Sequence, residues 1–205
     1  EHPSVFRWAA YLTGREGKIK VGEYRFDGSE SASSILAKLT AGAVDYRRVI
    51  VPEGLMLTEI AAVTARRTGI DSVRFVELAS DRGLIDSLGF RGETLEGYLF
   101  PDTYLITWPF APREIIVQMV RRFRDVYERE ATGAADSAGM SRREVVTLAS
   151  IIQAEAGYDG EMRKISAVYH NRLNKGMRLE ADPTVAYALG GIRRKLWYKD
   201  LRVDS

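Results

Sequence analysis

Apolar residues at helical spacing, each run with its own start signal, constrain the fold of this 205-residue chain most strongly. Pro112 stands where a first-turn proline belongs, and an apolar stripe follows it at i, i+3, i+4 spacing to about Glu130. Ser141 and Glu144 form a capping-box pattern that opens a helix reaching about Ala156. The second half of the chain is therefore expected to be mostly helical.

Two more helices are expected further on, with one loop before them. A helix over Glu161–Lys175 is closed by Gly176, and another begins near Pro183 with Asp182 as its cap. The segment Thr132–Gly139 is expected to be a flexible connection.

The first half suggests a strand, a turn and a helix, used twice in a faint repeat. Lys18–Phe26 alternates like a half-buried strand, and helical spacing follows over Ser31–Leu39. The second unit is a strand at Tyr46–Val51, a Pro-Glu-Gly turn and a helix at Leu57–Arg67. Short helices are expected over Ser4–Leu12, Asp71–Ala79 and Leu84–Leu88.

A domain boundary is expected near Gly89–Thr94, where the texture changes to an aromatic, turn-rich stretch. We predict an α+β protein, with an N-terminal region over residues 1–92 made of small β/α modules. An α-rich domain with a small β element would cover residues 93–205 and continue beyond Ser205.

Composition narrows the functional classes. Thirty Lys and Arg against 28 Asp and Glu leave a net charge of +2, too small to imply nucleic acid. There are no cysteines and only two histidines, and His170 lacks the spacing of metal motifs, so no metal site is expected. Neither a GxGxxG nor a Walker pattern occurs, and we expect no cofactor. No apolar run approaches the ~20 residues of a membrane span.

Glu155 is the candidate catalyst. On a helical wheel it lies at the margin of a stripe formed by Val145, Leu148, Ala149, Ile152 and Ala156. Burial at that margin would favour the protonated carboxyl, which is the form that donates a proton to a glycosidic oxygen. The alternative is a solvated glutamate at a helix edge.

The stretch Glu96–Tyr104 combines aromatic and acidic residues at a density suited to holding a sugar. Aromatic faces stack on sugar C–H surfaces, and carboxylates accept hydroxyl hydrogen bonds. Its candidate substrate-binding residues are Glu96, Tyr98, Asp102 and Tyr104. The alternative is a β-hairpin with a hydrophobic face.

Two further polar clusters supply Asn171, Arg172, Asp182 and Thr184 as candidate substrate-binding residues. Asp182 and Thr184 have a simpler alternative role in capping, and His170 is expected to be structural or on the surface.

Three motifs in the same order, LASIIQAEA, YHNRLNKGMRLEADPTVAYALG and EGYLFPDTY, resemble the MltG (YceG-like) family of endolytic murein transglycosylases. The family pattern A-S-I-V-E-K-E-x maps its second Glu onto Glu155 and its first onto Gln153. The segment VIVPEGLMLTEIAAV over Val49–Val63 resembles a LysM-type glycan-binding module, with Glu53 interrupting the usual Pro-Gly.

The resemblance implies an endolytic peptidoglycan lytic transglycosylase with Glu155 as its single acid-base catalyst. Such an enzyme cleaves bonds between N-acetylmuramic acid and N-acetylglucosamine in nascent glycan strands, leaves 1,6-anhydro ends and limits strand elongation. Tyr98, Asp102 and Asn171 would hold sugars, while Glu96 and Arg172 would position Glu155 or tune its charge.

The resemblance also implies a place in the cell. An N-terminal anchor absent from this chain would hold the protein in the bacterial inner membrane, with its catalytic part facing the wall beside peptidoglycan synthases. Two other functions stay open. One is a glycan-binding protein without catalysis, and the other is a hydrolase that uses Glu155 with Glu161 or Glu180 and water.

Overall fold

The structure is a computed structural model that describes residues 3–24, 26–43, 45–191, 196–197 and 200. Residues 201–205, the last of the predicted α-rich domain, lie outside these residues. The protein is α+β, as predicted, and it is mostly helical with a small two-stranded sheet. None of the described helices is both long and apolar enough to cross a membrane.

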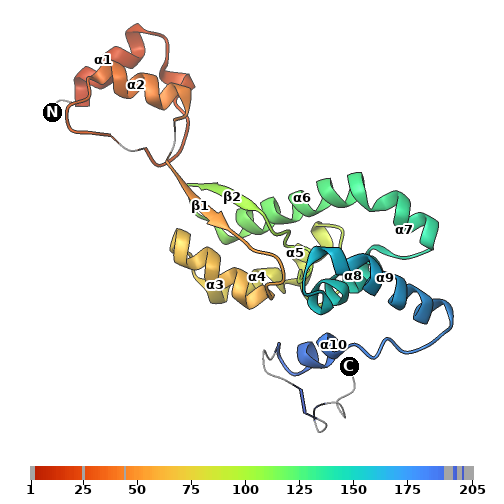
Figure 1. The fold of residues 1–205 in the computed structure, drawn as a ribbon. Coiled ribbons are helices and arrows are strands. Elements are labelled where there is room, and N and C mark those ends of the chain that lie inside the picture. Colours follow the sequence, from red (N-terminus) through yellow and green to blue (C-terminus); the bar gives the residue numbers. More distant parts are fainter. Residues whose placement is uncertain (1–2, 25, 44, 192–195, 198–199, 201–205) are drawn as a thin grey trace.

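The N-terminal unit contains α1 (Pro3–Leu12), the short 3-10 helix η1 (Glu16–Lys18) and α2 (Ala32–Ala41). Figure 1 shows α1 and α2 side by side, apart from the rest of the fold. Both helices were predicted. Ser31 caps α2, because its hydroxyl oxygen accepts from the Ser34 N–H at 3.2 Å.

The strand predicted over Lys18–Phe26 is wrong for the residues described there. After η1 the backbone is irregular, and Ile19 and Val21 are exposed. The Tyr24 hydroxyl donates to the Lys20 carbonyl, which curls the segment back on itself. Alternation predicts a strand only where a partner strand and a covered face exist, and this segment has neither. The predicted repeat of strand, turn and helix therefore holds for its second unit alone.

The sheet pairs β1 (Tyr46–Ile50) with β2 (Thr103–Thr107) in antiparallel register, with Val49 opposite Tyr104. Val49, Tyr104 and Ile106 face the core, whereas Ile50 and Leu105 point outward. One covered face and one open face are usual for an antiparallel pair.

Four helices build the main core against this sheet. They are α3 (Leu57–Thr68), α4 (Ser72–Ala79), α5 (Arg82–Ser87) and α6 (Pro112–Glu130), and all four were predicted. Phe75, Ile85, Leu95, Ile116 and Met119 are almost completely buried in one cluster. Residues on both sides of position 92 thus share a core, and the division of the chain there stays a prediction.

The last four helices are α7 (Thr132–Ala138), α8 (Arg142–Glu155), α9 (Asp159–Asn174) and α10 (Asp182–Ala188). The flexible connection predicted over Thr132–Gly139 is wrong, because α7 occupies it. Ala135 is buried, and Gly139 ends α7 in the left-handed conformation with φ 64°. A second, smaller core joins α8 and α9 through Leu148, Ile151 and Tyr169.

Candidate active site

The helix α8 places Glu155 at its last position. The predicted capping box is confirmed: the Ser141 hydroxyl oxygen accepts from the Glu144 N–H at 3.3 Å, and the Glu144 carboxylate accepts from the Ser141 N–H at 2.8 Å. Beyond Glu155 the Gly157 N–H donates to the Glu161 carboxylate at 3.0 Å. The capping box fixes the start of α8, and the hydrogen bond from Gly157 fixes the backbone just after its end, so the position of Glu155 at the helix end is well defined.

Glu155 is exposed, so the burial predicted for it is wrong. Leu148 and Ile151 are the buried residues of α8, whereas Ala149, predicted to be in the stripe, is exposed. The helix is rotated from the predicted orientation because α9 and the segment before α10 cover its Ile151 side. The chemistry of this carboxylate therefore depends on the side chains around it.

Tyr169 of α9 is the neighbour that sequence reasoning missed. It is 7% exposed, and its hydroxyl makes a hydrogen bond with the Glu155 side chain. Burial, then the charge of Glu155 and this hydrogen bond, raise the pKa of Tyr169, while Arg172 lowers it and Asp182 raises it further. Glu155, Tyr169, Arg172 and Asp182 therefore share one electrostatic environment. The only signal in the sequence was the place of Tyr169 at the head of its motif.

The guanidinium group of Arg172 is hydrogen-bonded within the protein. One of its nitrogens donates to the Leu179 carbonyl at 2.7 Å and to the Arg178 carbonyl at 3.1 Å, and it pairs with the Glu180 carboxylate at 2.9 Å. Glu180 has φ 51°, a conformation that side chains rarely adopt. Arg172 thus holds the segment that leads from α9 into α10.

The start of α10 differs from the prediction. The cap position belongs to Ala181, and Asp182 is the first residue of the helix. Asp182 is exposed, as is Asn171 on α9. The Thr184 hydroxyl donates to the Ala181 carbonyl at 2.8 Å, which closes the first turn. The side chains of Asp182 and Asn171 are thus accessible to a ligand. Asp182 lies in the electrostatic environment that Tyr169 shares with Glu155, and Asn171 lies on the same helix as Tyr169.

Glu96 lies in a second cluster, at the start of α3. Its carboxylate accepts from the Leu57 N–H, and it is close to Glu59 and Tyr187. Burial, and then the charge of Glu59, raise the pKa of Glu96, against the Leu57 hydrogen bond that lowers it. The charge of Glu96 also acts on Tyr187 of α10, so this cluster and α10 are electrostatically linked.

The other three candidates from Glu96–Tyr104 have protein partners. Tyr98 is 7% exposed and packs on Phe90 and Phe123, with ring centroids 4.4 and 5.2 Å away. Tyr104 is buried in β2 and donates to the Phe100 carbonyl. Asp102 pairs with Arg122 of α6 at 2.6 Å. These three residues lie in the main core and against α6, and no contact brings them to Glu155.

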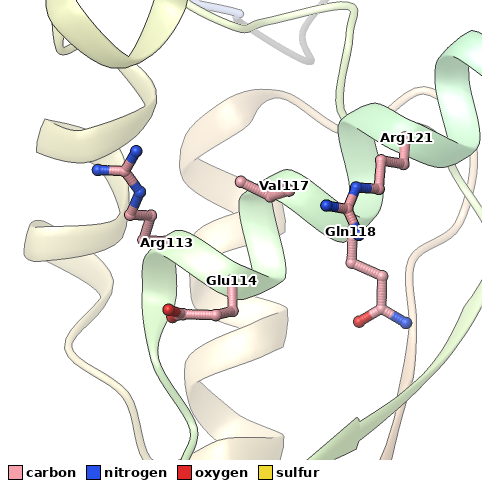
Figure 2. Close-up of a pocket in the computed structure, with 5 residues that line it drawn as sticks. All are labelled: Arg113, Glu114, Val117, Gln118 and Arg121. Carbon is pink, nitrogen blue, oxygen red and sulfur yellow. The ribbon is translucent and has the colours of Figure 1, made fainter. Parts of the chain in front are cut away.

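Glu155 does not line either of two hollows on the surface of the described residues. Figure 2 shows one of about 540 Å³ along α6, formed by Arg113, Glu114, Val117, Gln118 and Arg121. Another, of about 340 Å³, lies between β1 and α3, where Ile50, Val63, Arg66 and Arg67 form it. We locate the active site by its chemistry instead, since a glycan strand is a long ligand that an open surface can bind. Within the described part of the chain, no group of three or more acidic or histidine side chains could hold a metal ion.

Comparison with known proteins identifies the family. The chain belongs to the YceG-like family, whose sequence model matches residues 1–205. It is 31% identical over 216 residues to the endolytic murein transglycosylase of Bacillus subtilis (strain 168), covering 98% of this chain and 60% of that protein. It is 25% identical to the endolytic murein transglycosylase of Streptococcus pneumoniae serotype 2 (strain D39 / NCTC 7466), covering 91% of this chain and 39% of that protein.

A solved structure agrees. The crystal structure of a putative YceG-like protein from Listeria monocytogenes is similar to this chain with a TM-score of 0.70 and 27% identity, covering 100% of this chain and 72% of that one. The predicted family is therefore confirmed. The chain spans 60% or less of the length of these curated relatives.

Proposed function

We propose that this chain is the core of an endolytic lytic transglycosylase that cuts peptidoglycan glycan strands with Glu155 as its only acid-base group. The observation that carries the proposal is the exposed carboxylate at the end of α8, hydrogen-bonded by a buried tyrosine, in a chain similar to endolytic murein transglycosylases. An exposed carboxylate on a fixed helix end can reach a polymer that is too large to enter a cavity.

In the proposed reaction Glu155 first protonates the oxygen that links N-acetylmuramic acid to N-acetylglucosamine. As a carboxylate it then takes the proton from the muramyl 6-hydroxyl, whose oxygen closes on C1. The nucleophile belongs to the substrate, so one protein carboxyl serves both steps. The Tyr169 hydroxyl would orient that carboxyl, and Asp182 and Asn171 would bind sugar hydroxyls.

The contacts of Glu161 and Glu180 weigh against a hydrolase with two carboxylates. Glu161 accepts from the Gly157 N–H, and Glu180 pairs with Arg172. A second catalytic carboxylate would have to face the substrate or a water beside it, whereas both of these already have partners in the protein.

Product analysis tests the proposal. The intact protein would be incubated with purified glycan strands and the products weighed by mass spectrometry. Anhydro ends lack one water relative to hydrolysed ends, so the two reactions separate cleanly. Glu155→Gln should keep the fold and lose at least ~10²-fold in rate. Reducing ends without the anhydro ring would support the hydrolase, and binding without products would support a glycan-binding protein.

We further propose that Tyr46–Arg67 contributes a LysM-like grip on glycan. Its support is the succession of β1, the Pro52–Gly54 turn and α3. The alternative is charge attraction through Arg47, Arg48, Arg66 and Arg67, which salt would screen. Because residues 1–92 share their core with α6, the test needs the whole chain. Glu155→Gln protein should be retained on purified peptidoglycan at ~0.3 M salt, and complete loss of retention would leave only nonspecific charge attraction.

The location also remains a proposal. We propose that the protein works outside the cytoplasm of a bacterium, held to the inner membrane by an N-terminal anchor and placed beside peptidoglycan synthases. Its support is the resemblance to enzymes named for murein.

A further inference from the structure

A sugar-stacking residue near Glu155 needs an open aromatic ring. The predicted candidates Tyr98 and Tyr104 are buried, whereas Tyr158 is 65% exposed. Tyr158 lies on the turn between α8 and α9, three residues beyond Glu155. Consecutive Cα atoms are about 3.8 Å apart, so the two Cα atoms lie within about 11 Å of each other.

Gly160 gives the Tyr158 ring its place. A Cβ added to Gly160 would lie 2.6 Å from Cε2 and 3.1 Å from Cδ2 of that ring, so the ring rests directly against the glycine. The part of the ring that carries Cδ2 and Cε2 therefore lies against the backbone at Gly160, and most of the side chain remains exposed to solvent. Only glycine at position 160 leaves room for this contact.

The turn that carries the ring is held at two points. The Gly157 N–H donates to the Glu161 carboxylate at 3.0 Å, and the Glu161 N–H donates to the Tyr158 carbonyl at 3.0 Å. A ring on a fixed turn loses little freedom when a ligand binds, which favours affinity.

We propose that Tyr158, seated on Gly160, is a sugar-stacking platform at a subsite adjoining Glu155, where it binds the apolar C–H face of an N-acetylated sugar of the glycan strand. The inference rests on the proposed function and deepens it by assigning a substrate contact. Stacking of this kind is apolar, so its contribution does not fade with salt.

Binding to the Glu155→Gln chain measures the platform without turnover. The probe is a soluble, peptide-free oligosaccharide of alternating N-acetylglucosamine and N-acetylmuramic acid, titrated by calorimetry. Tyr158→Ala should weaken binding about 3- to 10-fold, the size of a good aromatic contact. Tyr158→Phe keeps the ring and should bind like the parent. Tyr11→Ala, which removes an equally exposed tyrosine from α1, is the matched control and should also bind like the parent.

Gly160→Ala provides an independent variant that leaves Tyr158 in the chain. The added methyl group displaces the ring, yet alanine is the better helix former, so α9 should not be destabilised. The expected loss of affinity equals that of Tyr158→Ala, and the double variant should lose no more than either single one.

Parent-like binding by Tyr158→Ala overturns the inference, as does absence of probe binding by the parent chain. Turnover of the unmodified protein separates this from the proposed function. Anhydro products with an unchanged KM in Tyr158→Ala would overturn the platform alone. Probe binding that depends on Tyr158, without any anhydro product, would overturn the proposed reaction and keep the platform.

Discussion

Gln153 of α8 donates a hydrogen bond of 2.7 Å to the carboxylate of Glu53, which lies in the turn between β1 and α3. The two residues are 100 positions apart in the chain. Gln153 is two residues before Glu155, so this contact joins the end of α8 to the turn before α3. Met56 of the same turn packs closely against Gly191 beyond α10, which is a second long-range contact of this turn.

We predict that Gln153→Glu slows cleavage, because it places two carboxylates where a donor and an acceptor now meet. The loss should be about 2- to 10-fold, the range of one exposed hydrogen bond. Initial rates on glycan strands measure it.

The reversed pair supplies the control for that variant. Glu53→Gln combined with Gln153→Glu restores a donor and an acceptor with their positions exchanged, and it should recover most of the lost rate. A double variant as slow as Gln153→Glu alone would show that the contact does not position α8.

Tyr169→Phe should keep the packing of α8 on α9 and lower kcat about tenfold, because it removes a hydrogen bond to a charged group. KM should stay nearly unchanged. The pKa of Tyr169 is raised above its usual value of 10.0, so the hydroxyl keeps its proton through neutral pH. The ratio of the two rates should therefore be constant from about pH 5 to pH 9.

Tyr127→Phe is the matched control for Tyr169, since Tyr127 stacks on Phe123 away from Glu155. Its kinetics should equal those of the unmodified protein. An unaltered kcat in Tyr169→Phe would remove Tyr169 from the mechanism.

Ser141→Ala should lower the free energy of unfolding by about 1 kcal/mol through loss of the α8 cap. For a chain of this length the midpoint of thermal unfolding should fall by about 2–4 °C. Ser150→Ala, in the exposed interior of the same helix, should have little effect. Equal midpoints for Ser141→Ala and the unmodified chain would mean that the cap contributes nothing.

Glu96→Gln should change how stability depends on pH. The folded-state pKa of Glu96 is raised above 4.5, so the folded protein holds a proton that the unfolded chain has already lost. Its contribution is present below about pH 4.5 and is lost as pH rises through the raised pKa. The variant should not show this loss, so its advantage in thermal midpoint should grow across that window. Glu93→Gln at an exposed site nearby should track the unmodified chain.

The helices were predictable because their signals are local. Pro112 and the stripe after it gave α6 with its observed bounds, and Ser141 with Glu144 gave the start of α8. Caps and periodicity act over one or two turns, so no knowledge of distant residues is required.

The predictions that were wrong concern segments whose structure depends on residues far away in the sequence. The segment before Phe26 alternates like a strand but finds no partner, and Ala149 was placed in a stripe whose direction α9 decides. The sequence also shows where aromatic residues stand, but it does not show which of their side chains are exposed to solvent. Tyr98 and Tyr104 fill the core, and Tyr158 and Tyr187 remain exposed. The roles predicted for the candidate site residues stay predictions until the variants above are measured.

The pairing of β1 with β2 also governs when this protein can fold. Tyr46 lies opposite Thr107, so the sheet cannot form before the chain has emerged through residue 107. The core beneath it also needs Phe123 of α6. Closing so long a loop before its contacts form slows folding. The segment from β1 through α5 should therefore stay unfolded during synthesis until β2 and α6 have been made, whereas the unit of α1 and α2 does not depend on that sheet.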